Sequence, residues 1–205
     1  MRPLPPELVT APTALPVSLA EAKAHLRVDH DEGDARIEAA IAAAVGYLDG
    51  YGGILGRALM RQEWREYHGF WPASGAVELR LAPALSVSSV AVTAADGSET
   101  VVDPSAYRLV GAAAAPRLIL ALDAALPAPA CAPDAIAITY RAGYSADNDA
   151  AAQAEAVPAA LRSAILLMVG DLWRFTDGVA LGAVSAVPMS TTVDRLLAPY
   201  RRFAL

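Results

Sequence analysis

The residues best placed to do chemistry are two histidines beside a short acidic turn. His25 and His30 lie beside the acidic residues Asp29, Asp31 and Asp34. Histidine and carboxylate side chains can bind a metal ion, so a metal-dependent enzyme is one hypothesis. The spacing does not favour it, because helical zinc ligands are usually histidines four residues apart. A calcium loop needs a glutamate at its twelfth position, and the twelfth residue, counted with Asp29 as the first, is Ala40. We therefore expect a solvated turn that caps a helix, and no bound metal.

Other catalytic signatures are missing from the sequence. The glycines from Gly50 to Gly56 are not followed by the Lys-Ser/Thr pair of a phosphate loop, and no serine lies in a Gly-x-Ser-x-Gly pattern. The single cysteine, Cys131, can form neither an internal disulfide nor a cysteine metal site. The sequence thus predicts a protein that is not an enzyme, with no catalytic residue and no cofactor.

Length and charge narrow the class of protein further. The 205 residues suit one domain or two small ones. A net charge of −6 argues against binding nucleic acid through a general basic field. The most apolar run, residues 164–169, is too short for a membrane span of about 20 residues. We expect a chain without a targeting segment that is soluble and intracellular when made.

The first 60 residues predict a helical hairpin. Five prolines keep residues 1–17 extended as a lead-in. Ser18 and Glu21 then form a capping box, the start of a helix that ends near Arg27. A second helix is expected from about Asp34 to Asp49, because apolar residues recur there at helical spacing until glycines follow.

Alternating apolar and polar residues then replace the helical spacing. From Arg61 to about Tyr144 the pattern predicts short antiparallel strands, with a hairpin turn at Ala95–Ser98. The expected strand residues are Val77, Leu79 and Leu81; Val90 and Val92; Tyr107 and Leu109, paired with Leu118 and Leu120; and Ile136, Ile138 and Tyr140. We interpret residues 61–144 as a β-rich insertion between two helical halves.

A long apolar helix is expected after a linker at residues 145–156. Pro158 fits its first turn, and the helix should run to about Phe175. The predicted apolar face holds Leu161, Ile165, Met168, Leu172 and Phe175, widened by Leu166, Val169 and Trp173, and the polar strip holds Ser163, Gly170, Arg174 and Asp177. A helix apolar over most of its girth is buried on several sides, so we expect the core of the helical half, with subunit contacts as a second use.

The chain ends in an arm that is apolar on one side and basic at its tip. After a loop reaching Pro188, Thr191 or Thr192 should cap a short helix. Free termini fray unless something holds them, so we predict that the arm docks on a partner; the alternative is a helix packed on its own subunit. The candidate partner-binding residues are Arg195, Leu196, Leu197, Pro199, Tyr200, Arg201, Arg202 and Phe203.

Together these elements predict an α+β fold, in which a helical bundle carries an inserted small antiparallel β module and a C-terminal arm. The expected segments are an extended lead-in at 1–17, N-terminal bundle helices at 18–60, the β-rich insertion at 61–144, a long bundle helix and loop at 145–187, and the docking arm at 188–205.

Four motifs, in order along the chain, resemble one family. They are Pro16–Asp29; Gly56–Trp64; Tyr140–Tyr144, followed by Val157-Pro158 and the apolar helix; and Leu196–Arg201. In this combination the sequence is similar to the head–tail connector (adaptor) proteins of tailed bacteriophages and of phage-like gene transfer agents.

The resemblance implies a structural protein of the virion, made in the bacterial cytoplasm and located at the head–tail interface. Such adaptors self-associate into a ring, typically a dodecamer, below the portal protein. They bridge the portal to a stopper or tail-completion protein, and DNA passes through the ring channel without specific binding. The arm at Arg195–Phe203 would pack on the portal. A small metal-dependent enzyme using His25 and His30, or a cytoplasmic binding module, remain as alternatives.

Overall fold

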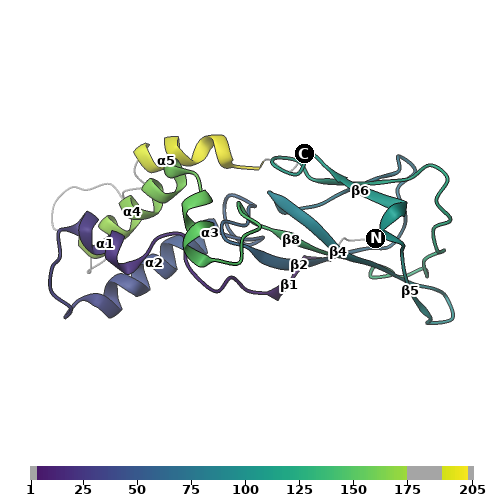
Figure 1. Cartoon of the computed structure of the whole chain (residues 1–205), viewed down its shortest axis with the longest axis horizontal. Helices are drawn as coiled ribbons and strands as arrows, with labels where there is room; N and C mark the ends of the chain where they lie inside the picture. The colour runs from purple at the N-terminus through teal and green to yellow at the C-terminus, as the bar shows by residue number, and fades with distance from the viewer. Residues whose placement is uncertain (1–3, 175–190, 203–205) are drawn as a thin grey trace, which may run out of the picture. The chain divides into compact units, whose positions relative to one another are not determined.

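The computed structural model describes residues 4–174 and 191–202 and has an α+β fold (Figure 1). The chain divides into two compact units, each built from separate parts of the sequence. We call them the β unit, Met1–Pro12 with Arg61–Ala146, and the helical unit, Thr13–Met60 with Asp147–Leu205. The two units are described in turn.

Local signals define the first two helices of the helical unit. Helix α1 (Leu19–Leu26) begins with the predicted capping box: Ser18 Oγ accepts from the Glu21 N–H, and the Glu21 carboxylate accepts from the Ser18 N–H. Helix α2 (Asp34–Leu48) also forms where predicted. Its N-cap is Gly33, which makes no side-chain capping bond, and the acidic turn contributes Asp34 to the first turn of the helix, as expected.

Helix α4 (Ala159–Arg174) is the central helix of this unit and packs against α1, α2 and α5 (Thr191–Leu197). Its fully buried apolar residues are Leu161, Ala164, Ile165 and Val169. Two expectations are corrected. Gly170, assigned to the polar strip, is buried, and His25 of α1 lies near it. Leu172, assigned to the apolar face, is 45% exposed. The predicted Phe175 and Asp177 lie outside the described residues.

The predicted linker at 145–156 is wrong, because it contains helix α3 (Ala150–Ala156). Asp149 caps this helix by accepting from the Ala152 N–H at 2.9 Å, and five of its seven residues are alanine, the strongest helix former. No single helix in the described ranges has the length and apolar content of a membrane span; only α3 and α4 together reach it, and they are bent by 99°.

The β unit consists of two antiparallel sheets. The larger sheet has the order β1-β2-β8-β4-β5, and the smaller has the order β3-β7-β6. The strands are β1 (Glu7–Thr10), β2 (Gln62–His68), β3 (Ala76–Glu78), β4 (Ala84–Thr93), β5 (Glu99–Val101), β6 (Tyr107–Val110), β7 (Arg117–Leu120) and β8 (Ile136–Ala142), with a 3₁₀ turn, η1, at Pro104–Ala106. The predicted β4–β5 hairpin, the β6–β7 pair and the last strand are confirmed.

Part of the N-terminal lead-in, which was expected only to be extended, forms a β-strand. Strand β1 pairs with β2, with Glu7 opposite Arg65. Tyr67 Oη donates to the Glu7 carboxylate at 2.8 Å. The lead-in is therefore an edge strand of the β unit, bonded to residues that lie more than fifty positions later in the sequence.

A buried polar cluster lies in the core of the β unit. The Glu66 carboxylate accepts hydrogen bonds from Tyr140 Oη and from the Arg80 N–H, the latter at 2.7 Å. Tyr140 Oη in turn accepts from the Leu81 N–H at 3.1 Å. Tyr140 and Glu66 are both buried. Because Arg80 and Leu81 follow strand β3, these bonds join the connection from the smaller sheet to strands β2 and β8 of the larger one.

Candidate partner interface

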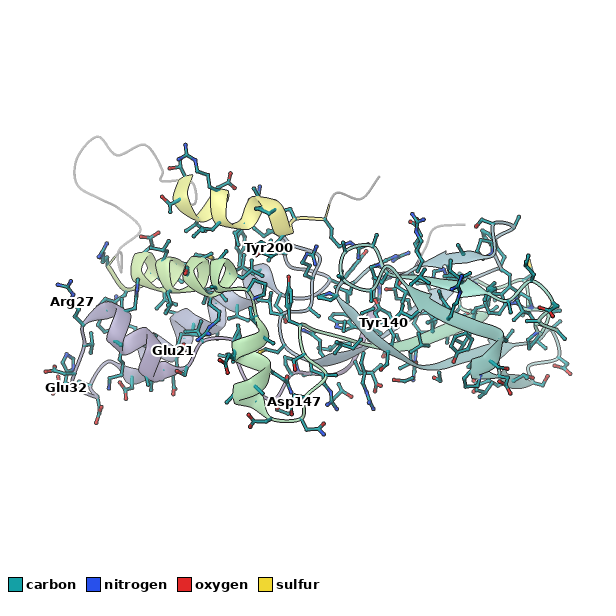
Figure 2. All side chains as sticks on the ribbon, turned by 45° about the horizontal axis from the view of Figure 1, so that its top comes forward. Glu21, Arg27, Glu32, Tyr140, Asp147 and Tyr200 are labelled. Atoms are coloured by element: carbon teal, nitrogen blue, oxygen red, sulfur yellow. The ribbon has the colours of Figure 1, made fainter. Side chains whose placement is uncertain are left out.

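The C-terminal arm packs by one face on its own subunit. Val193 and Leu197 are fully buried, and α5 packs on α4 (yellow over green in Figures 1 and 2). The two side chains are four residues apart, the spacing that puts helix positions on one face. The alternative left open by the sequence, a helix packed on its own subunit, therefore describes this inner face of the arm.

The end of the arm is fastened to the loop after α2. Arg57, which is buried, donates from Nε to the Tyr200 carbonyl at 2.6 Å. The Arg202 N–H donates to the Leu55 carbonyl at 3.2 Å. These bonds hold the 3₁₀ turn η2 (Ala198–Tyr200), whose Tyr200 is labelled in Figure 2, and the extended residues that follow it.

A glycine sets the backbone of the loop on which the end of the arm packs. Gly56 has a φ of +59°, in the left-handed region, and a Cβ there would lie 3.7 Å from the Cβ of Arg202, an ordinary contact distance. A residue with a side chain would be strained in this conformation. Glycine is therefore favoured here by the turn of the loop and not by the approach of the arm.

The eight predicted docking residues divide between the two faces of the arm. Arg195 and Pro199 are exposed; Leu196, Tyr200, Arg201 and Arg202 are half-buried; Leu197 is buried; and Phe203 lies outside the described residues. Arg201 pairs with Asp194 at 2.6 Å. We call the residues with outward exposure, Arg195, Leu196, Pro199 and Tyr200, the arm surface. Sequence reasoning missed the anchor Val193, although its spacing from Leu197 was a usable signal.

A lysine forms ion pairs with two carboxylates of the acidic turn. Lys23 of α1 lies 2.6 Å from Asp31 and 2.7 Å from Asp34, and so joins α1 to the start of α2. Its hydrogen bond lowers the pKa of Asp31, and the two carboxylates raise the pKa of Lys23. His25 and His30 are exposed. Across residues 4–174 and 191–202, no group of three or more His, Cys, Asp or Glu residues could hold a metal ion.

Comparisons with known proteins connect this arrangement to one family. Residues 16–100 match the family model described as "Phage gp6-like head-tail connector protein". No curated protein sequence matches the chain significantly. The resemblance inferred from the four motifs is therefore supported by sequence over the part that includes the capping box and the first strand of the insertion.

Solved structures extend the similarity over the whole chain. A chain of "Virion of native gene transfer agent (GTA) particle" is 26% identical, with a TM-score of 0.74, and the alignment covers 98% of this chain and 97% of that chain. A chain of "Neck of empty GTA particle computed with C6 symmetry" is 25% identical, with a TM-score of 0.75 and coverages of 98% and 96%. A chain of "Neck of native GTA particle computed with C12 symmetry" is 25% identical, with a TM-score of 0.69 and coverages of 100% and 97%. The resemblance to head–tail connectors is confirmed.

Proposed function

We propose that this relative of the head–tail connector proteins is a structural, non-enzymatic connector in the neck of a phage-like particle. In that role it forms a ring below the portal protein and bridges the portal to a stopper or tail-completion protein. The observation that carries the proposal is the agreement in fold, over at least 98% of the sequence, with chains from virion and neck structures of gene transfer agent particles. The neck of the empty particle was computed with C6 symmetry and the neck of the native particle with C12 symmetry. These symmetries support a ring and favour twelve subunits.

The composition of the chain suits a ring with a DNA channel. Ring closure requires two different faces on each subunit that fit one another. Leu172 on α4 is a large apolar side chain with 45% exposure, which supports the helical unit as part of such a face. A net charge of −6 would let DNA pass through the channel without adhering.

In this proposal each segment has a task. The helices within residues 18–60 and 147–174 form the helical bundle of the ring, residues 61–144 are the inserted β module, and residues 191–202 belong to the docking arm. The lead-in at 1–17 fastens the insertion through β1.

The arm surface is the proposed portal contact. Arginine and tyrosine are enriched among the residues that dominate interface energies, and Arg195 and Tyr200 supply them here. Because Val193 and Leu197 anchor the arm, its outward residues are already ordered before binding. Pre-ordering reduces the entropy cost of association.

The test must leave the arm's anchors in place. Truncation after Pro188 would remove Val193 and Leu197 and so uncover α4. The double substitution Arg195→Glu with Leu196→Glu changes only exposed or half-buried positions of the arm surface. Arg108→Glu is the control for reversing the charge of an exposed arginine away from the arm, because Arg108 lies on the exposed side of β6 in the β unit.

We expect the double variant to unfold like the original protein and to bind the portal protein of its particle at least about tenfold more weakly, a loss of about 1.4 kcal/mol. Surface plasmon resonance with immobilised portal rings measures this difference. The Arg108→Glu control should bind normally. Portal binding of unchanged affinity by the double variant would refute the role of the arm surface.

A further inference from the structure

One edge of the larger sheet has unused backbone groups. The Val102 N–H donates to the Val90 carbonyl and the Ala94 N–H to the Ser98 carbonyl, both at 2.8 Å. In an antiparallel ladder the bonded pairs alternate, so Thr100 is the bonded residue of β5, and Glu99 and Val101 direct their N–H and C=O groups away from β4. Within the described part of the chain, no other backbone hydrogen bond reaches these two residues.

A groove of about 450 Å³ runs beside this edge. Its lining includes Thr100, Val101, Asp103, Asp123 and Pro127. The far wall, residues 121–127, is held at both ends: the Ala121 N–H donates to the Ala106 carbonyl at 2.8 Å, and Trp71 Nε1 donates to the Pro127 carbonyl at 3.0 Å. The groove is therefore formed before anything binds in it.

The side chains around the groove select the chemistry of an occupant. Asp103 and Asp123 contribute two carboxylates to the lining. Hydrogen bonds from Ser105 hold Asp103 in place and lower its pKa, so it is charged at neutral pH. Val101 is 64% exposed, and Leu122, between the lining residues Ala121 and Asp123, is fully exposed. An extended segment with apolar side chains and an arginine or lysine would satisfy all of these groups.

We infer that β5 receives an added strand from a second neck protein, through an extended segment that is apolar and basic. The inference rests on the proposed function and concerns its other partner, on the tail side of the ring. Added strands gain affinity from main-chain hydrogen bonds and specificity from side-chain pockets. The two carboxylates in the lining, Asp103 and Asp123, complement the charge of a basic segment.

The register of β5 supplies a matched pair of variants. Val101→Pro removes an N–H that is directed away from β4 and leaves the bonds between β4 and β5 in place, as proline is tolerated on the open side of an edge strand. Val101→Thr keeps the N–H and a β-branched side chain. Asp123→Lys reverses one charge of the groove without touching the strand. Thermal unfolding of each purified variant checks that it is folded.

The experiment is assembly of particles in cells that produce each variant in place of the original chain, with electron microscopy of the purified particles. We expect Val101→Pro and Asp123→Lys to give heads that carry the connector ring but at least about tenfold fewer tails, and Val101→Thr to give normal particles. Loss of the ring from the heads in the arm-surface variant reports on the proposed function separately.

Two outcomes would overturn the inference. Normal numbers of tails with both Val101→Pro and Asp123→Lys would show that the edge is not used. Heads without the connector ring in these variants would show that the edge joins neighbouring copies of this chain. If Val101→Pro fails to fold, the number of tails on particles that carry Asp123→Lys decides whether the inference holds.

Discussion

The helical unit and the β unit are stabilised by different kinds of polar contact. In the helical unit the capping box spans three residues, and the Lys23–Asp31 pair spans eight, both at the surface. In the β unit the buried carboxylate of Glu66 bonds the hydroxyl of Tyr140, 74 residues away. The comparison teaches that the β unit depends on fully buried polar bonds between distant segments, whereas the helical unit combines local surface contacts with less deeply buried distant bonds, such as that from Arg57 to the Tyr200 carbonyl.

Burial determines how much each contact matters. Exposed ion pairs contribute about 0–1 kcal/mol, because water solvates the separated charges almost as well. A buried polar group that loses its partner costs about 1–3 kcal/mol, and more when a charge is involved. The most damaging polar substitutions should therefore lie in the β unit.

Glu66→Ala should have the largest effect. It leaves the hydroxyl of Tyr140 and the N–H of Arg80 without their acceptor inside the core, so we expect a loss of about 3–5 kcal/mol of unfolding free energy. Denaturant unfolding measures it. The matched control is Glu63→Ala on the outer face of the same strand, which should cost less than about 1 kcal/mol. Equal losses of unfolding free energy in Glu66→Ala and Glu63→Ala would show that burial does not determine how much a polar contact of the β unit contributes.

His68 should give the β unit a pH dependence. Burial, and next the charge of Arg80, lower its pKa from 6.5 to about 4. Between these values the unfolded chain binds a proton that the folded chain does not, so stability falls as the pH drops from about 6.5 to about 4. The total loss should be about 2–3 kcal/mol. Unfolding of the original protein and of His68→Gln across this range measures the effect, and the variant should have the flatter profile. Parallel profiles would rule out His68 as the cause.

A third pair of substitutions tests packing within the helical unit. A Cβ at Gly33 would lie 2.6 Å from the indole of Trp173, which Arg36 covers at 4.5 Å from the ring centroid. Gly33→Ala should therefore cost about 1–3 kcal/mol. Gly46→Ala, on the same helix with no atom within 4 Å of its Cβ, should stabilise by about 0.5–1 kcal/mol. Opposite signs in thermal unfolding would show that this unit depends on a steric contact between distant residues as well as on distant polar bonds such as that from Arg57 to the Tyr200 carbonyl.

Sequence patterns predicted the elements whose causes are local. The Ser18–Glu21 box, the turn at Ala95–Ser98 and the alternation around Ile138 each act within a few residues, so the helix, the hairpin and the strand follow from them. The family resemblance could also be inferred, because its motifs lie in these same segments.

Features that depend on distant partners could not be predicted. Nothing near Glu7 indicates that β1 pairs with β2, and nothing near Glu66 indicates that Tyr140 will bond it. Helix α3 was missed for another reason, since its alanines resemble the composition of a linker. At the arm, the sequence predicted a docking surface but did not separate the inner anchor Leu197 from the outer Arg195; docking itself remains a prediction.

Ser18→Ala should have a much smaller effect than Glu66→Ala, because it removes only the exposed hydroxyl cap from the Glu21 N–H. We expect a loss of about 1 kcal/mol in denaturant unfolding at neutral pH. The bond from the Ser18 N–H is the first cause of the lowered pKa of Glu21 and survives in the variant, because it comes from the backbone. Glu21 therefore still contributes stability above its usual pKa of 4.5, and both proteins should lose that part as the pH falls below this value. A loss as large as that of Glu66→Ala would mean that the local contacts of the helical unit are as decisive as the buried cluster of the β unit.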